Sequence, residues 1–323
     1  MPTKLKHTLS LTPTPIAGLA LGLASLGLSW QFISPNLSNI QLVLAFIASI
    51  LLVLLLTKFV LHPALLLADL KHPLLSSVLP TSSMALMVIS VSVREFSQDT
   101  GTGLWLIATG IHGLFLLCFI YFRLRDFALE HMAPSWFVPP IGIIVAAVCC
   151  PSANYLALSQ LLLWFGISCY GLMLPVMLYR LILCTPLIDA AKPTLAIMAA
   201  PASLSLAGYL SVISEPSLPV ILLLLGIALL MTLLIYFTLF HLLRQPFSPG
   251  FAAFTFPLVI GATALFKVSD CCFEWPVTQQ LSRVLHQIAI VELVVATLMV
   301  VYVSYCYLSQ WRHIYADSKH PAK

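Results

Sequence analysis

Charged side chains are scarce in this 323-residue sequence. Lys, Arg, Asp and Glu together make up 8% of it, whereas soluble domains carry roughly 25% charged residues. Hydrophobic residues make up 60%, and the mean hydropathy is +1.03. So few charges cannot cover a folded chain of this size with a wetted surface. This excludes a soluble globular protein and indicates that lipid is the solvent for most of the chain.

Motifs of common enzymes and of nucleic-acid-binding proteins are also missing. The sequence contains neither the HExxH motif of metalloproteases nor the GxSxG turn of serine hydrolases, and the glycines that flank Ser168 have the wrong spacing. The nine His are scattered singly, and the eight Cys show neither CxxC nor zinc-finger spacing. The 15 Lys and Arg form no basic arm or patch. We therefore expect no enzyme, catalytic residue, metal, cofactor or nucleic-acid partner.

Most cysteines lie inside apolar runs, where Cys packs as a small hydrophobic residue. Two vicinal pairs, Cys149–Cys150 and Cys271–Cys272, fall near predicted helix ends on the same predicted side of the membrane. A disulfide between the pairs is one interpretation. Packing without a disulfide is the interpretation that we favour.

Ten segments are apolar enough to cross a bilayer as helices, which takes about 20 residues each. They span 14–34, 39–61, 73–93, 102–123, 135–150, 154–183, 193–213, 218–243, 249–267 and 285–308. The first follows Lys4 and Lys6 without a clear small-residue cleavage site, so we expect a retained helix and no cleaved signal. The sequence predicts an all-α integral membrane protein. Residues 1–323 form one transmembrane domain, with a short N-terminus 1–12 and a short C-terminus 309–323.

The basic residues predict the orientation. With the N-terminus in the cytoplasm, Arg94, Lys267 and Arg283 fall outside and the other Lys and Arg fall inside, as the positive-inside rule requires. We expect both chain ends in the cytoplasm and a bacterial inner (plasma) membrane location. The inner residues are Lys4, Lys6, Lys58, Lys71, Arg123, Arg125, Arg180, Lys192, Arg244, Arg312, Lys319 and Lys323.

Proline recurs with a period of about two membrane helices. Pro15, Pro73, Pro134, Pro193 and Pro249 each stand at or near the start of an odd-numbered segment. Such a period is the signature of an internal repeat. Four odd segments carry further prolines inside, and we interpret the chain as five helical hairpins, each with one Pro-bent odd helix and one plainer even helix. These further prolines are Pro80, Pro139 with Pro140, Pro201 and Pro257.

The odd segments are also rich in small and hydroxyl residues, whereas several even segments are bulky and apolar. Small residues and bends suit a protein interior or a water-filled path, and bulky helices suit lipid. We therefore favour an inner ring of odd helices around a path, with even helices outside. The alternative is ordinary small-residue packing with no path.

Such a path would be nearly uncharged. A helix that restarts after a proline presents an N-terminal end with a partly positive field, and Ser and Thr add donors, so the path would favour anions. One acid, Glu292 in the tenth segment, is a candidate coupling acid for proton-linked transport. The alternative is that Glu292 is buried at the membrane interface beside a pairing side chain, because the tenth segment starts near it.

Several segments resemble the tellurite-resistance/dicarboxylate transporter (TehA-like) family, which is homologous to plant slow anion channels. The similarity spans nearly the whole chain, and its specificity comes from the order and spacing of motifs that are modest alone. The motifs are PTPIAGLALGLA from Pro13, His72-Pro73, HMAPSWFVP from His131, Lys192-Pro193, APASLSLAGYL from Ala200, and AFTFP from Ala253.

The resemblance implies a homotrimer in which each chain folds as ten helices in five hairpins, with quasi-five-fold symmetry around a central pore. It implies that a Phe of the ninth helix closes the pore: Phe256 matches, with Phe254 as the rival if the register slips. Gly18 matches a pore-facing Gly, and Leu174 stands where a bacterial relative carries an acid. The candidates for pore lining are Gly18, Pro15, Pro80, Pro140, Pro201 and Pro257.

The expected function is an anion channel or transporter in membrane lipid. Small anions, tellurite-like oxyanions and C4-dicarboxylates all agree with the resemblance. The alternative is an efflux transporter for toxic lipophilic cations such as dyes and quaternary ammonium compounds, in which Glu292 would couple export to protons.

Overall fold

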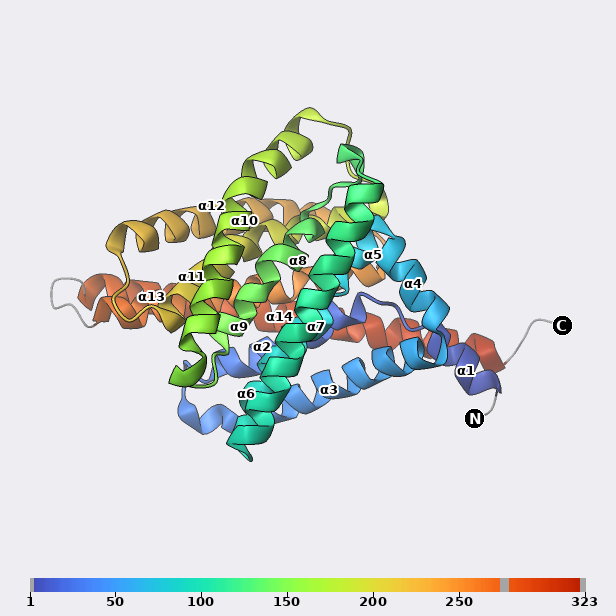
Figure 1. The fold of residues 1–323 in the computed structure, drawn as a ribbon, viewed down its shortest axis with the longest axis horizontal. Coiled ribbons are helices and arrows are strands. Elements are labelled where there is room, and N and C mark those ends of the chain that lie inside the picture. Colours follow the sequence, from blue (N-terminus) through green and yellow to red (C-terminus); the bar gives the residue numbers. More distant parts are fainter. Residues whose placement is uncertain (1–2, 274–278, 320–323) are drawn as a thin grey trace.

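The computed structural model describes residues 3–273 and 279–319. Within these ranges every regular element is a helix and no strand occurs (Figure 1). Eight helical stretches are long and apolar enough to cross a membrane, so the expected multi-pass, all-α membrane protein is confirmed. They are Ser38–Leu61, Pro73–Arg94, Gln98–Arg125, Ala153–Leu183, Asp189–Val212, Leu218–Leu242, Pro249–Cys272 and Gln279–Arg312.

The first and fifth predicted segments fall on shorter apolar helices, Ile16–Trp30 and Pro134–Val148. In both, prolines explain the loss of length. The chain enters the first through Pro13 and Pro15, and three prolines interrupt the fifth. A proline has no N–H for the helix ladder and its ring clashes with the preceding turn, so regular helix is interrupted on its N-terminal side.

The even segments are long regular helices. Two further helices lie outside the ten predicted segments. They are α1 (Thr3–Ser10), before the first segment, and α4 (Pro63–Lys71), between the second and the third. The even helices are α3 (Ser38–Leu61), α7 (Gln98–Arg125), α10 (Leu156–Leu183), α12 (Leu218–Leu242) and α14 (Gln279–Lys319). Short 3-10 turns occur at η1 (Pro35–Leu37), η2 (Leu129–His131) and η5 (Ala153–Tyr155).

The first odd segment is one short helix, and the other four are interrupted helices. In the last two, a 3-10 run leads into an α-helix whose first turn carries the interior proline, Pro201 or Pro257. At that position the missing N–H has no helical partner to lose. The odd segments are α2 (Ile16–Trp30); α5 (Pro73–Val78) with α6 (Thr81–Arg94); η3 (Pro134–Phe137), α8 (Val138–Ile141), η4 (Gly142–Ile144) and α9 (Val145–Val148); η6 (Asp189–Ala199) with α11 (Ala200–Val212); and η7 (Pro249–Phe254) with α13 (Phe256–Phe273).

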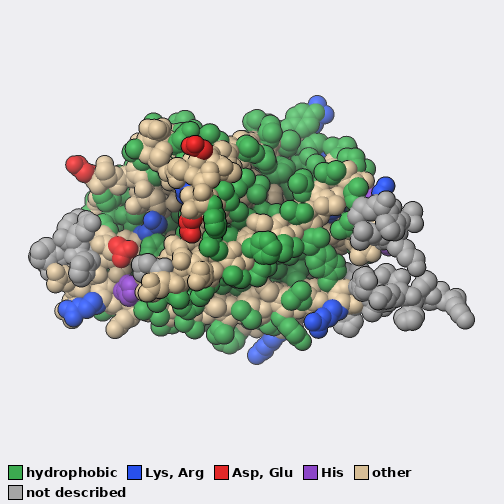
Figure 2. Space-filling model, turned by 90° about the horizontal axis from the view of Figure 1, so that it is seen from below, with side chains coloured by type: hydrophobic (Ala, Val, Ile, Leu, Met, Phe, Trp, Pro, Cys, Tyr) green, Lys and Arg blue, Asp and Glu red, His purple; other side chains and the backbone are tan. Residues whose placement is uncertain are grey.

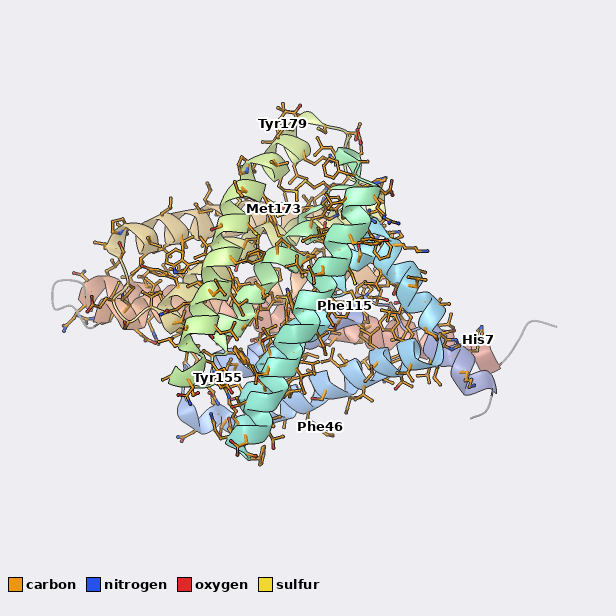
Figure 3. All side chains as sticks on the ribbon, in the orientation of Figure 1. His7, Phe46, Phe115, Tyr155, Met173 and Tyr179 are labelled. Carbon is orange, nitrogen blue, oxygen red and sulfur yellow. The ribbon has the colours of Figure 1, made fainter. Side chains whose placement is uncertain are left out.

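Burial separates the two kinds of segment as predicted. In the odd segments 73–94, 189–212 and 249–272, 67%, 83% and 89% of the most apolar stretch is buried, against 22% to 39% in the even segments. The even helices present large apolar side chains outward, as Phe46 on α3 does in Figure 3. Hydrophobic side chains also cover much of the face in Figure 2. An apolar exterior of this extent suits contact with lipid.

The five odd segments close on themselves. α2 contacts α6, α6 contacts α9, α9 contacts α11, α11 contacts α13, and α13 contacts α2. Each even helix packs on the odd segment that precedes it in the chain. The regular helices therefore lie outside a closed set of interrupted ones.

Hydrogen bonds near the ends of three even helices join each to the start of its own odd segment. In each bond a buried side chain donates to a backbone carbonyl. These bonds tie each even helix to the chain near the start of its own hairpin. The pairs are Arg123 with Lys71, Arg180 with Leu129 and Tyr307 with Pro249.

The two ends of the described chain lie on the same side of the molecule, because α1 contacts α14 (Figure 1). This agrees with an even number of crossings. The tenth predicted segment, 285–308, is longer in the structure, where α14 runs from Gln279 to Lys319. Hydropathy marks where the apolar stretch ends, whereas the helix continues through Arg283 and Arg312, both of them good helix formers.

Candidate functional site

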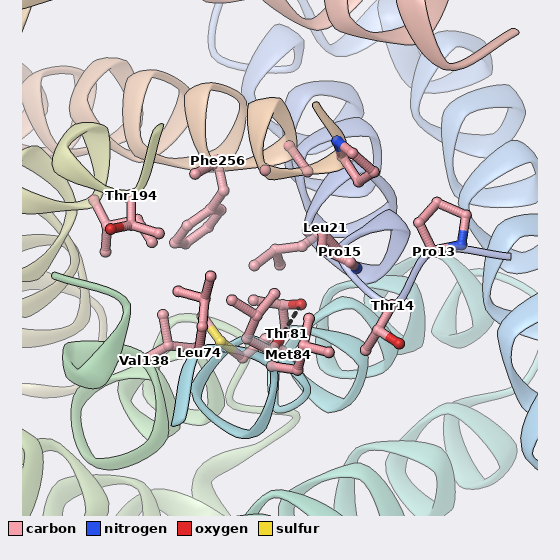
Figure 4. A pocket seen from close by; sticks show the side chains of 18 of the residues that line it. Pro13, Thr14, Pro15, Leu21, Leu74, Thr81, Met84, Val138, Thr194 and Phe256 are labelled. Atoms are coloured by element: carbon pink, nitrogen blue, oxygen red, sulfur yellow. Dashed lines mark hydrogen bonds between the residues drawn. The ribbon is translucent and has the colours of Figure 1, made fainter. Parts of the chain in front are cut away.

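A cavity of about 450 Å³ lies among the odd segments, and all five contribute to its wall (Figure 4). We call it the large cavity. It begins beside Leu11, whose side chain is 44% exposed, and it ends at the buried residues Leu204 and Phe256. Its wall is mostly apolar and includes Leu21, Leu75, Met84, Val138, Ile141, Ile197 and Ala252.

A second, small cavity of about 20 Å³ follows farther along the same segments. This is enough for about one water molecule, and again all five odd segments line it. Its wall includes the hydroxyls of Ser25, Ser29 and Thr263. Ser29 and Thr263 are hydrogen-bonded at 2.7 Å, whereas the buried Ser25 hydroxyl has no partner among the described residues.

Phe256 and Leu204 are the two residues that line both cavities. Both are buried, Phe256 with 7% of its surface exposed. The Phe256 ring extends from the start of α13 into the large cavity (Figure 4). These two side chains therefore stand between the two cavities.

Residues 13–308 match the SLAC1 family, described as voltage-dependent anion channel. This chain belongs to the SLAC1 family. Two relatives from Methanocaldococcus jannaschii, each named an uncharacterized transporter, share 28% identity over 234 residues and 27% over 230 residues. The matches cover 65% and 62% of this chain, and 68% and 66% of the relatives. The predicted family is confirmed, and with it a membrane protein of the anion channel and transporter class.

The structure separates the two candidate phenylalanines of this SLAC1-family chain. Phe254 is fully buried and lines neither cavity; it packs against Phe251 with ring centroids 4.9 Å apart. Of the pair, Phe256 alone lines a cavity. That Phe256 closes a pore stays a prediction.

Four of the six pore-lining candidates lie on the wall of the large cavity: Pro15, Gly18, Pro201 and Pro257. Pro80 and Pro140 are buried but absent from the wall. At those two breaks the following residues, Thr81 and Ile141, line the cavity instead. Proline spacing locates a break along the chain but does not specify which side of it faces inward.

Close approach of α2 and the start of α13 positions Phe256. The Thr255 hydroxyl donates to the Gly18 carbonyl at 3.2 Å. A Cβ on Gly18 would lie 3.3 Å from that of Ala252, and a Cβ on Gly22 would lie 2.4 Å from the Thr255 hydroxyl oxygen. Glycine at position 22 is thus required for the backbones to come this close, and the residue next to the contact is Phe256.

A buried histidine supports the breaks in two odd segments. His112 of α7 lies between the Ser83 hydroxyl at 3.1 Å and the Pro139 carbonyl at 2.9 Å. Ser83 in turn donates to the Pro80 carbonyl at 2.7 Å. Carbonyls left without a ladder partner must be paired inside the protein in a membrane, and His112 pairs one of them.

Glu292 is placed behind α13 and away from the passage. It is 8% exposed on α14 and lines neither cavity. Its carboxylate oxygen lies 3.0 Å from the position that a Cβ on Gly261 would take. A coupling role for Glu292 stays a prediction.

Sequence reasoning missed Leu204 and two charged residues, Lys58 and Asp69. These two are the charged side chains on the described wall of the large cavity, and they form an ion pair at 3.7 Å. Lys58 entered the sequence analysis only as an inner-side charge. One signal was available: it lies within the second apolar segment, where a charge needs a partner.

Proposed function

We propose that this protein conducts small anions through the passage among its five odd segments, and that Phe256 is the gate. The observation that carries the proposal is the interruption between two cavities, both lined by all five odd segments, at Phe256 and Leu204. Removing the aromatic ring would join the cavities.

The wall favours anions for a physical reason. Four α-helices of 13 to 18 residues, α2, α6, α11 and α13, begin at the large cavity with their first residue or cap on its wall. Helix N-termini carry partial positive charge. A diffuse positive potential attracts an anion without holding it tightly, which suits conduction.

The architecture that fits this function is a single domain of ten transmembrane helices in five hairpins with quasi-five-fold symmetry. The closed contacts among the odd segments support it. We further propose a homotrimer in the bacterial inner membrane with both chain ends in the cytoplasm. Chloride, nitrate, tellurite-like oxyanions and C4-dicarboxylates are the candidate substrates.

Ion-replacement currents test the function. Purified wild-type protein and Phe256→Ala would be compared in planar bilayers, with chloride, nitrate, malate or tellurite as the anion. We expect Phe256→Ala to raise the conductance strongly and the reversal potential to follow the anion gradient. A strictly cation-selective current, or no current from either protein, would contradict the proposal.

Export of lipophilic cations is the alternative, with Glu292 as the coupling acid. It has less support because Glu292 lines neither cavity. Proton-linked dye export that Glu292→Gln abolishes, while Phe256→Ala leaves anion currents unchanged, would favour this alternative.

A further inference from the structure

The charged pair of the large cavity stands where a permeating ion would enter. Lys58 lies in the last turn of α3 and Asp69 in α4; they are 6% and 9% exposed. Both line the cavity, as does Thr14. The other described residues that line the large cavity carry no charge. This pair therefore dominates the electrostatic field at its part of the cavity wall.

The three side chains form one connected group. The Lys58 ammonium donates to the Thr14 hydroxyl at 3.0 Å, and Thr14 donates to an Asp69 carboxylate oxygen. The direct distance from Lys58 to Asp69 is 3.7 Å, longer than a hydrogen bond. An ammonium has three donors, so Lys58 keeps donor capacity on the cavity wall after its bond to Thr14.

The corresponding basic residues of the next two hairpins, Arg123 and Arg180, make different contacts from those of Lys58. Arg123 and Arg180 are buried near the same end of α7 and α10 and donate to backbone carbonyls, Arg180 to those of Leu129, Glu130 and Thr185. Neither lines a cavity. Lys58 has no hydrogen bond to a carbonyl among the described contacts and is the basic residue that reaches the passage.

We propose that Lys58 is the anion-binding residue at the entrance of the passage, and that Asp69 and Thr14 limit how tightly it binds. This inference rests on the proposed function. An anion entering the large cavity accepts a hydrogen bond from the ammonium. The neighbouring carboxylate cancels much of the ammonium field, so the anion leaves again toward Phe256.

Charge arithmetic at the pair makes this testable. Asp69→Asn leaves a net positive entrance, which should hold an anion longer. Lys58→Gln leaves a net negative entrance, which should repel it. The double variant Lys58→Gln/Asp69→Asn is neutral, as the native pair is. Lys71→Gln is the matched control, because Lys71 is exposed at the end of α4 and lines neither cavity.

The experiment measures chloride currents in planar bilayers with Phe256→Ala as the open background. We expect Asp69→Asn to lower the half-saturating chloride concentration by about fivefold or more, and Lys58→Gln to raise it by a similar factor and reduce chloride over sodium selectivity. Lys71→Gln should stay close to the background. The double variant should bind chloride more weakly than the background but less weakly than Lys58→Gln, because it lacks both the ammonium donor and the repelling carboxylate. The inference is overturned if the background conducts chloride and Asp69→Asn, Lys58→Gln and the double variant all behave like Lys71→Gln.

Two further results distinguish a failure of the proposed function from a failure of the inference about Lys58. No chloride current from the background protein contradicts the proposed function itself. If Lys58→Gln does not fold, two measurements replace it. One is the half-saturating chloride concentration of Asp69→Asn, and the other is the position of iodide in crystals of the wild-type protein. An anomalous iodide peak beside the Lys58 ammonium supports the site; iodide found only elsewhere, together with an unchanged Asp69→Asn, overturns it.

Discussion

At the residue scale, the proposed closure involves two side chains from different hairpins, Phe256 and Leu204. Each lines both cavities, so each blocks part of the same cross-section. We expect Leu204→Ala to raise anion conductance less than Phe256→Ala, because it removes less volume, and the double variant to conduct most. Bilayer currents check this order.

Phe254→Ala is the control for this pair. Phe254 is a core residue that touches neither cavity, so its truncation should cost about 3–5 kcal/mol of stability and leave the single-channel conductance unchanged. If Phe254→Ala opens the passage while Phe256→Ala does not, the assignment of the gate is wrong.

Gly22 gives a second prediction at this scale. A Cβ there would meet Thr255 within 2.5 Å at two of its side-chain atoms, so Gly22→Ala must push α2 and α13 apart. We expect a loss of about 1–3 kcal/mol, read as a lower unfolding temperature in detergent. Gly226→Ala is the matched control, because a Cβ on Gly226 of α12 meets nothing within 4 Å. Equal effects of the two substitutions would contradict the close-approach argument.

At the scale of elements, proline positions predicted where the odd segments break. They did not predict that η6 and η7 are 3-10 runs, because this depends on how neighbouring segments pack. The fifth segment shows the same limit. Pro139 and Pro140 indicate a bend, whereas the actual chain passes through four short helical pieces between Pro134 and Val148.

His112 gives the prediction that belongs to this scale, since it joins two broken segments through Ser83 and Pro139. His112→Ala leaves a carbonyl and a hydroxyl buried without this partner, which should cost about 1–3 kcal/mol for each. Thermal unfolding in detergent measures the loss. His241→Ala, at an exposed position near the end of α12, should change stability little; a comparable loss there would show that His112 has no special role.

At the scale of the whole molecule, composition and hydropathy predicted the order of elements and the buried odd segments, because both signals are local in sequence. The contacts of the site are not local. Lys58 meets Thr14 across 44 positions, and Leu204 and Phe256 meet the same two cavities from different hairpins. Such contacts depend on how each helix is rotated about its axis, which hydropathy does not specify inside an all-apolar segment.

The whole-molecule prediction concerns independence of the chains. Both cavities are lined by the five odd segments of one chain, so the proposed passage lies within a single chain. In bilayers that contain assemblies of mixed wild-type and Phe256→Ala chains, the anion current should therefore rise in proportion to the fraction of Phe256→Ala chains. A passage formed between chains would instead open only in assemblies with several substituted copies, and the current would rise steeply at high fractions. A proportional rise supports conduction through each chain, and a steep rise places the conducting route at the contacts between chains.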